Sequence, residues 1–351
     1  MQSVYFEGLP FQGRPTRVFA WYGVPEAAQP APGIVLVHGG GGTAFAEWVR
    51  LWNQRGFAAI AMDLNGQLPV GTYGNWTQHD WAGPLGICSP GSGGMNEVEW
   101  PVEDHWPYHA VGAVLGAHSL LRSLPGVDAN RIGVTGISWG GYTTCLIAGV
   151  DARFRFAVPV YGCGFLGENS VWLSNFAEMG AERAGRWLGL WDPKHYLPHA
   201  GMPMLWVTGT NDFAYPMDSL QRSYRLPSTP RTLCLRVRME HGHGGHGENP
   251  AEIAAFARHF CDGTPPLPEI LTQHRLGREV SLTYRAHTQI THAELNVTAD
   301  HGDWPLREWR SLPARIDGDC VSATLPDDVT VYYLNLFDER ECAVSSEHYE
   351  V

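Results

Sequence analysis

GISWGG, residues 136–141, places a serine between glycines, where an apolar run gives way to a stretch of small residues. The run before it, RIGVT at 131–135, has the character of a buried strand, and YTTCLIAG after it, at 142–149, can form a helix. A serine at such a strand-to-helix turn is typical of a nucleophile elbow, which needs small neighbours because other backbone approaches closely. We therefore predict that Ser138 is a nucleophile held at the carboxyl end of a sheet.

Short apolar runs recur along the first three quarters of the chain, with helical patterns between or after them. Apolar runs of this kind are typical of parallel strands that are covered on both faces. The pattern predicts an α/β fold with a doubly wound, mostly parallel sheet. We expect strands at 33–39, 57–64, 131–137, 154–162, 202–210 and 232–239, and helices at 108–124 and 250–260.

The pattern of residue types changes after Phe260. The stretch CDGTPPLPEI that follows is rich in proline and is typical of a linker. Beyond it, runs such as REVSLTYRA and VTVYYLNLF alternate apolar and polar residues with a period of two. We therefore predict two domains. The first is a catalytic domain over residues 1–262, with insertions near 65–107 and 163–200, and the second is a small antiparallel β-sandwich over residues 263–351.

The first insertion carries four tryptophans, Trp76, Trp81, Trp100 and Trp106. This is more than an exposed loop usually holds, so we expect these rings either to form a hydrophobic lid or to offer stacking faces to a sugar.

The tail contains VYYLNLFDERECAVSS, residues 331–346, which predicts two strands around a turn. Tyr332, Leu334 and Leu336 alternate onto one face, as core residues do. We expect the tail to pack against the first domain or a second subunit of a homo-oligomer, and to make no catalytic contribution.

The composition excludes several classes of partner. The chain has 351 residues, a net charge of −12 and a single lysine, Lys194, so it offers no basic surface for nucleic acid or an anionic membrane. We find no export signal and no apolar run long enough to span a membrane. The seven cysteines are scattered without CxxC spacing, which favours reduced thiols. We therefore expect a soluble cytoplasmic protein.

A serine nucleophile needs a base to take its proton and an acid to orient that base. The stretch MPMLWVTGTNDFAYP, residues 202–216, places Asp212 just past a predicted strand, where such an acid belongs. Asp218 lies further along, within the next expected helix, and is the weaker candidate. We predict that Asp212 is the acid.

Three histidines compete for the role of the base in RMEHGHGGHGENP, residues 238–250. We prefer His243, because the glycines on either side of it leave the imidazole unhindered. His241 is the alternative, and His246 is not expected to take part. The same cluster could bind zinc, but no cysteine or carboxylate stands at a matching spacing, so we expect no metal.

A serine that attacks a carbonyl group also needs two N–H donors for the negative oxygen that develops during the reaction. The N–H of Trp139, directly after the serine, is one expected donor. The other is expected from the glycine-rich loop in LVHGGGGTAF, residues 36–45, at Gly40 or alternatively Gly41. This loop has neither the lysine of a phosphate-binding P-loop nor GxGxxG spacing.

The motifs VHGGGG, GISWGG, GTNDFAYP and HGHGG, in this order and spacing, resemble an α/β-hydrolase of the acetyl xylan esterase, dienelactone hydrolase and prolyl-oligopeptidase-like group. The resemblance covers about residues 15–262. It implies a serine esterase in which Ser138, Asp212 and His243 match nucleophile, acid and base, and Gly40 and Trp139 match the oxyanion donors. The peptidases of the group carry a large β-propeller, for which this chain lacks the length, so peptidase activity is disfavoured.

The expected function is therefore a cofactor-independent serine carboxylesterase that hydrolyses short-chain, acetyl-type esters through an acyl-enzyme. The expected substrate is a small-molecule or saccharide ester. Two alternatives stay open. One is a lactonase or dienelactone-type hydrolase, although those enzymes most often use cysteine at the elbow. The other is a non-catalytic binding protein on the same fold.

Overall fold

A twisted central sheet organises the first part of the molecule. The computed structural model describes residues 1–69, 79–81 and 93–351, and within them the sheet has eight strands in the order β1-β2-β4-β3-β7-β8-β9-β10. The bounds are β1 (Gln2–Glu7), β2 (Arg17–Gly23), β3 (Ala31–Val37), β4 (Ala58–Met62), β7 (Val127–Ile137), β8 (Ala157–Val160), β9 (Met204–Gly209) and β10 (Arg231–Arg236). From β4 to β10 all neighbouring strands are parallel, whereas β1 and β2 are antiparallel additions at one edge.

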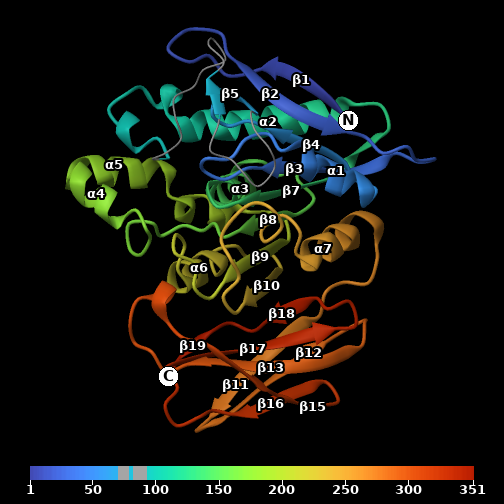
Figure 1. The fold of residues 1–351 in the computed structure, drawn as a ribbon, viewed down its shortest axis with the longest axis vertical. Coiled ribbons are helices and arrows are strands. Elements are labelled where there is room, and N and C mark those ends of the chain that lie inside the picture. Colours follow the sequence, from blue (N-terminus) through green and yellow to red (C-terminus); the bar gives the residue numbers. More distant parts are fainter. Residues whose placement is uncertain (70–78, 82–92) are drawn as a thin grey trace.

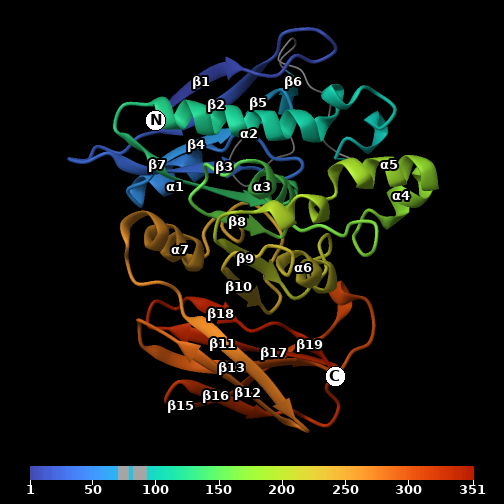
Figure 2. The ribbon, with the colours of Figure 1, turned by 180° about the vertical axis from the view of Figure 1, so that it is seen from behind.

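The helices cover both faces of this sheet. They are α1 (Ala46–Gln54), α2 (Trp106–Ser123), α3 (Trp139–Val150), α4 (Leu173–Met179), α5 (Ala181–Trp191), α6 (Met217–Tyr224) and α7 (Ala251–Asp262). The chain moves one way across the sheet from β3 to β4 and the opposite way from β4 to β7. Because such crossovers are right-handed, α1 and α2 lie on opposite faces. The predicted doubly wound, mostly parallel sheet is confirmed (Figures 1 and 2).

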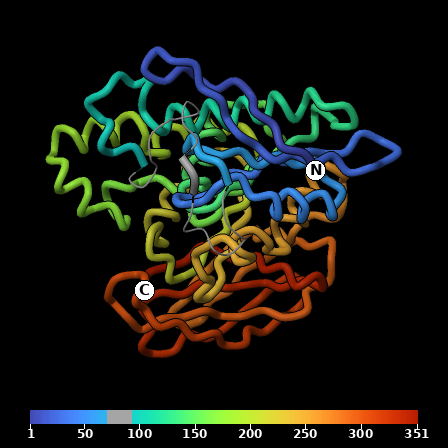
Figure 3. Tube along the Cα trace, turned by 45° about the horizontal axis from the view of Figure 1, so that its top comes forward, coloured from blue at the N-terminus to red at the C-terminus, as the bar shows by residue number. Residues whose placement is uncertain are grey.

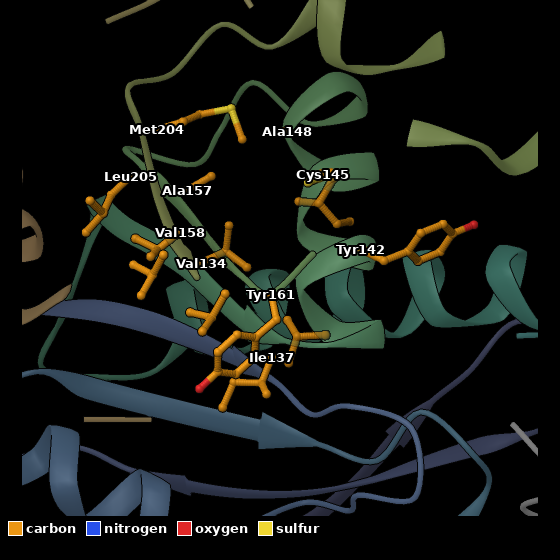
Figure 4. Close-up of a cluster of buried hydrophobic side chains, with 14 of the residues drawn as sticks. Val134, Ile137, Tyr142, Cys145, Ala148, Ala157, Val158, Tyr161, Met204 and Leu205 are labelled. Atoms are coloured by element: carbon orange, nitrogen blue, oxygen red, sulfur yellow. The ribbon is translucent and has the colours of Figure 1, made fainter. Parts of the chain in front are cut away.

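The core of the sheet is apolar on both faces. Ile34, Val35, Leu36 and Val37 of β3 are all fully buried, as expected for a central parallel strand. Figure 4 shows side chains of β7, β8 and β9 facing those of α3, with Ile137 at the end of β7. This packing holds the first turn of α3 against the carboxyl ends of the strands, where Ser138 stands.

The two expected insertions differ in how much of them the structure describes. In the first, the described elements are β5 (Gln67–Pro69), which pairs with β6 (His79–Trp81), and the short 3₁₀ helices η2 (Met95–Glu97) and η3 (Val102–Asp104). The second contains α4 and α5, which project together at one side of the sheet (Figure 1), and the 3₁₀ helices η4 (Pro193–His195) and η5 (Leu197–His199).

The last part of the chain is a sandwich of two antiparallel sheets. One contains β11 (Glu269–Leu276), β12 (Glu279–Arg285), β16 (Cys320–Thr324) and β15 (Arg315–Asp317), and the other β14 (Arg310–Pro313), β13 (Ile290–Thr298), β17 (Val331–Asp338), β18 (Ala343–Ser345) and β19 (Tyr349–Glu350). A 3₁₀ helix, η6 (Trp304–Leu306), lies between β13 and β14. We call strands β11 to β19 with their loops the C-terminal β domain. Tyr332, Leu334 and Leu336 are buried in its own core and not against the first domain, whereas Val331 and Tyr333 of the same strand belong to the core cluster shared with the first domain.

The C-terminal β domain lies beyond the β10 edge of the central sheet, and Figure 3 shows it in orange and red as a separate layer. The Leu235 N–H of β10 donates to Ser345 Oγ at 2.7 Å. The Leu235 carbonyl accepts from Asn335 Nδ2 at 3.1 Å. Side chains thus satisfy backbone groups that an exposed edge strand would offer to another chain.

Two further expectations concern cysteines and membranes. The six cysteines in the described residues are free thiols, and all except Cys320 are buried; Cys88 lies outside the described residues. The part of the chain that the structure describes contains no helix long and apolar enough to cross a membrane.

Candidate active site

Ser138 occupies the turn between β7 and α3 in a conformation that non-glycine residues rarely adopt, with φ 58° and ψ −119°. Such a conformation costs on the order of 1–3 kcal/mol and persists only where surrounding structure imposes it. Here the Ser138 N–H donates to the Val160 carbonyl at 2.9 Å. A Cβ at position 140 would lie 2.0 Å from the Val37 carbonyl oxygen, so only glycine fits there. The predicted strand, tight turn and helix are all present.

Asp212 follows β9 in a tight turn and is buried, with a side chain 1% exposed. Its Oδ1 accepts hydrogen bonds from the N–H groups of Ala214 at 2.9 Å and Tyr215 at 2.7 Å. These bonds fix the carboxylate, and Oδ2 is directed to His241, whose Nδ1 lies 2.7 Å away. Asp212 therefore presents one oxygen to a histidine from the loop after β10.

The His241 ring is held on two sides by aromatic rings. Tyr161 stacks on it with ring centroids 4.6 Å apart, and Phe213 lies at 4.7 Å. The Tyr161 hydroxyl donates to the Glu240 carbonyl at 2.7 Å, which fixes the residue before His241. Since a carboxylate only accepts hydrogen bonds, Nδ1 carries the proton and Nε2 is left as an acceptor.

His243, the histidine preferred from the sequence, has different partners. Its Nδ1 lies 2.9 Å from Glu248 Oε1, and its Nε2 accepts the Gly39 N–H at 3.0 Å. The ring contacts Phe45 and Trp48, and burial, followed by repulsion from His38 and His241, lowers its pKa well below the usual value. Both ring nitrogens are thus engaged, and the structure places His241 rather than His243 beside Asp212.

Glu248 and Glu240, the two carboxylates of this loop, pair with different histidines. Burial raises the pKa of Glu248 to about 7, and His246, an exposed residue, contacts Glu240 at 2.9 Å. His241, His243 and His246 therefore each face a different carboxylate. In the described ranges, no group of three metal-ligating side chains converges in a way that could hold an ion.

The two residues expected to supply the oxyanion donors, Gly40 and Trp139, are in contact. Trp139 is the first residue of α3, so its N–H has no acceptor within the helix. A Cβ at Gly40 would lie 2.6 Å from Trp139 Cδ1, which places the Gly40 backbone directly against the Trp139 ring. Gly40 is exposed, and among the described residues its N–H has no acceptor. Both N–H groups can therefore serve an incoming oxygen.

The aromatic residues of the insertions mostly belong to the core. Trp106 is buried, donates its indole N–H to the Leu64 carbonyl at 3.1 Å and contacts Trp139 edge-on. Trp172, in the second insertion, also contacts Trp139. Both rings therefore pack on Trp139, the residue that follows Ser138. Trp76 lies outside the described residues, as does the side chain of Trp81.

Comparison with known protein families shows which family the chain belongs to. The family model for acetyl xylan esterase (AXE1) matches residues 2–181, which include Gly40, Ser138 and Trp139. The chain belongs to the acetyl xylan esterase (AXE1) family. This AXE1-family protein is a carboxylic ester hydrolase, as predicted. Asp212 and the histidine loop lie beyond the matched range.

Solved structures share the α/β-hydrolase fold of this AXE1-family protein. Acetyl xylan esterase from Paenibacillus sp. R4 is 22% identical, with a TM-score of 0.53 over 74% of this chain and 82% of that chain. Acetyl xylan esterase 1 from Thermoanaerobacterium sp. JW/SL YS485 is 18% identical, with a TM-score of 0.52 over 70% and 83%. An acylaminoacyl peptidase in complex with Z-Gly-Gly-Phe-chloromethyl ketone is 20% identical, with a TM-score of 0.51 over 74% of this chain but 41% of its own. The predicted resemblance is confirmed.

Sequence reasoning missed three residues that shape the site of this AXE1-family esterase. Tyr161 and Phe213 flank His241, and Glu248 pairs with His243. Tyr161 directly follows β8, and Phe213 directly follows Asp212, so their places at the carboxyl end of the sheet could have been found from the strand pattern. Glu248 has only its position in a glycine-rich loop, which carries no such signal.

Proposed function

We propose that this esterase is a serine hydrolase that cleaves short-chain, acetyl-type esters, with acetylated saccharides as substrates, through an acyl-enzyme. Ser138 is the nucleophile, His241 the general base and Asp212 the acid that orients it. The observation that carries this proposal is the 2.7 Å contact between His241 Nδ1 and Asp212 Oδ2, made at the same end of the sheet as the strained Ser138 turn. The assignment reverses the preference for His243 that the sequence favoured.

In the first half of the reaction, Ser138 Oγ attacks the ester carbonyl carbon while His241 Nε2 takes the hydroxyl proton. The Oγ–C bond forms and the carbonyl π electrons move to oxygen, giving a tetrahedral intermediate. The protonated His241 then gives its proton to the alcohol oxygen as the C–O bond of the ester breaks. The alcohol leaves, and the acyl group stays on Ser138.

The negative oxygen of the intermediate faces the N–H groups of Gly40 and Trp139. Such donors are effective because they are already in place when the charge develops. The Asp212 carboxylate stabilises the positive charge that His241 carries at the same moment, and it can do so because two backbone N–H groups hold it in position. The charges on both sides of the reacting carbon are thereby compensated.

In the second half, water attacks the acyl carbon while His241 Nε2 takes a water proton. The bond to Oγ then breaks, the proton returns from His241 to Ser138, and the carboxylic acid leaves. An acetyl group as the acyl part is supported by the family to which the chain belongs and by the two acetyl xylan esterases that share its fold.

Hydrolysis of p-nitrophenyl acetate and butyrate by the full chain tests the proposal. Ser138→Ala and His241→Ala should each lower kcat by about 10⁴-fold or more, because the members of such a triad act as a unit. The acetyl ester should be the better substrate. Turnover by Ser138→Ala at the wild-type rate would remove the serine mechanism.

A fluorophosphonate probe separates this proposal from a binding protein on the same fold. We expect an adduct on Ser138 in the wild-type protein and none in Ser138→Ala. A folded wild-type protein that neither reacts with the probe nor hydrolyses any ester would favour the binding protein. Release of acetate from acetylated xylo-oligosaccharides tests the substrate class, and faster hydrolysis of lactones would favour the lactonase alternative.

A further inference from the structure

A second histidine–carboxylate pair lies beside the first in the same loop. His243 and Glu248 are both buried, with side chains 7% and 1% exposed, and their Nδ1 and Oε1 atoms are 2.9 Å apart. The proposed reaction uses His241 and Asp212 and gives His243 and Glu248 no role. Burial of a polar pair costs free energy unless its hydrogen bonds are made. The hydrogen-bond partners of His243 therefore indicate what the pair does.

The bond to Gly39 fixes the protonation of the His243 ring. Since a backbone N–H can only donate, Nε2 must be the acceptor of the Gly39 N–H at 3.0 Å and carries no proton. The single ring proton of a neutral imidazole is therefore on Nδ1, where it is donated to Glu248. Glu248 thus holds the ring in the tautomer that can accept from Gly39.

Gly39 lies between this ring and the nucleophile turn. A Cβ at Gly39 would stand 3.0 Å from Ser138 Cβ and 3.4 Å from His243 Nε2. The Gly39 carbonyl accepts from His38 Nδ1 at 2.7 Å and from the Gly42 N–H at 3.0 Å. The peptide before Gly39 is therefore held by His243, and the peptide after it by His38 and Gly42.

The peptide after Gly39 also contains the Gly40 N–H. Because a trans peptide is planar, its N–H points opposite to its C=O. Fixing the Gly39 carbonyl on the side of His38 and Gly42 directs the Gly40 N–H to the other side. The orientation of this oxyanion donor therefore depends on where the backbone at Gly39 is held.

We propose that His243 and Glu248 are positioning residues of the oxyanion hole. Glu248 orients His243, and His243 holds the Gly39 N–H so that the next N–H along the chain, that of Gly40, faces the developing oxyanion above Ser138. This inference rests on the proposed serine esterase function, and it gives the two histidines of the loop different tasks: His241 moves a proton, and His243 holds backbone.

Kinetics of His243 variants in the full chain with p-nitrophenyl acetate test the inference. Removing an oxyanion donor costs about 10²–10³-fold in kcat, and a misdirected donor should cost less, so we expect His243→Ala to lower kcat by roughly 10–100-fold with KM changed less than about threefold. His243→Gln can accept from Gly39 through its amide oxygen and donate to Glu248 through its amide nitrogen, so it should recover most of the lost kcat. His243→Asn is too short to reach both partners and should stay low.

The matched control is His246→Gln, because His246 is an exposed histidine of the same loop whose ring pairs with Glu240. It should retain wild-type kcat. Affinity for a boronic acid, which forms a tetrahedral adduct on Ser138, should fall in His243→Ala by about the same factor as kcat/KM. A change in folding alone would not produce this proportionality.

The outcomes separate the two proposals. Loss of wild-type activity in Ser138→Ala establishes the serine mechanism independently of His243. With that established, His243→Ala at wild-type kcat, or His243→Gln no better than His243→Asn, would overturn the positioning role. A loss in His243→Ala as large as in Ser138→Ala, with His241→Ala still active, would instead make His243 the base. If His243→Ala does not fold, the comparison of His243→Gln with His243→Asn decides.

Discussion

Asn211 donates a hydrogen bond from Nδ2 to the Arg307 carbonyl at 2.7 Å, and the same amide nitrogen reaches the Pro305 carbonyl at 3.0 Å. Both carbonyls belong to the η6 segment of the C-terminal β domain, and Asn211 directly precedes Asp212. The domain for which no catalytic contribution was expected is therefore hydrogen-bonded to the turn that carries the proposed acid. These hydrogen bonds hold that turn in place.

Asn211→Ala should therefore reduce both stability and activity. Loss of hydrogen bonds that leaves partly buried carbonyls without a partner costs about 1–3 kcal/mol at most, and a looser Asp212 turn should lower kcat several-fold. Gln221→Ala is the matched control, since Gln221 Nε2 also bridges to the C-terminal β domain, at the His348 carbonyl, but from α6. Thermal unfolding and ester hydrolysis measure the two effects. Equal losses of kcat in both variants would mean that the domain acts only through global stability.

Asp212→Asn should lower kcat by about 10³–10⁴-fold with little change in structure. The N–H groups of Ala214 and Tyr215 will keep the amide oxygen at the Oδ1 position, which turns the new NH₂ group towards His241. His241 Nδ1 must then accept, so the ring proton moves to Nε2, where it blocks proton uptake from Ser138. Steady-state kinetics check the prediction. Asp218→Asn, a change in the candidate ranked second, should have no comparable effect.

Phe213 is 54% exposed although its ring lies against His241. An exposed ring beside the proposed base offers a face to the leaving group of the substrate, and ring contacts are worth about 0.5–1.5 kcal/mol. Phe213→Ala should thus raise KM for acetylated xylo-oligosaccharides by roughly 2–10-fold and change p-nitrophenyl acetate kinetics less. Tyr5→Ala, at an exposed aromatic of edge strand β1, is the control. Equal effects on the two substrates would argue against a sugar contact.

Two buried histidines predict loss of stability in acid. Desolvation, with nearby arginines adding to it, lowers the pKa of His118 to about 4 and that of His348 to about 3. In the unfolded chain both protonate near the usual value of about 6.5, so below that pH the unfolded state binds more protons than the folded state. The stability present above about pH 6.5 is therefore lost progressively as the pH falls towards 4.

The variant that tests this is His118→Leu. Both ring nitrogens of His118 are buried and make no hydrogen bond to the described residues, and its neighbour is the Phe154 ring at 4.5 Å. An apolar side chain fits this site, so the fall in Tm between about pH 7 and pH 5 should be smaller than in the wild-type protein. His195→Gln, at an exposed position, should leave the fall unchanged. An unaltered pH dependence in His118→Leu would show that His118 is not a source of the acid sensitivity.

Much of the fold and part of the site could be predicted because they depend on local patterns. The apolar runs that form β3, β4 and β7 to β10 can be recognised from their composition. The nucleophile turn can be recognised because it needs glycines within a few residues of Ser138. The antiparallel edge strand β1 was missed, because its residues alternate between exposed and partly buried, so it lacks the continuous apolar run that marks a central strand. The position of Asp212 at the carboxyl edge of the sheet could be predicted because it is a polar residue that directly follows a buried strand.

The sequence by itself determined the α/β sheet, the elbow at Ser138, the glycine-rich loop at Gly40 and the alternating strands of the tail, since each follows from periodicity or steric demands within a short segment. Only the tertiary structure shows that His241, and not His243, lies beside Asp212. These residues are two positions apart in a glycine-rich loop that has no periodic constraint, so nothing local selects the direction of either ring. The choice is made by Asp212, 29 residues from His241, and by Gly39, 204 residues from His243, because a hydrogen bond requires its two groups to meet in space, whatever their separation along the chain.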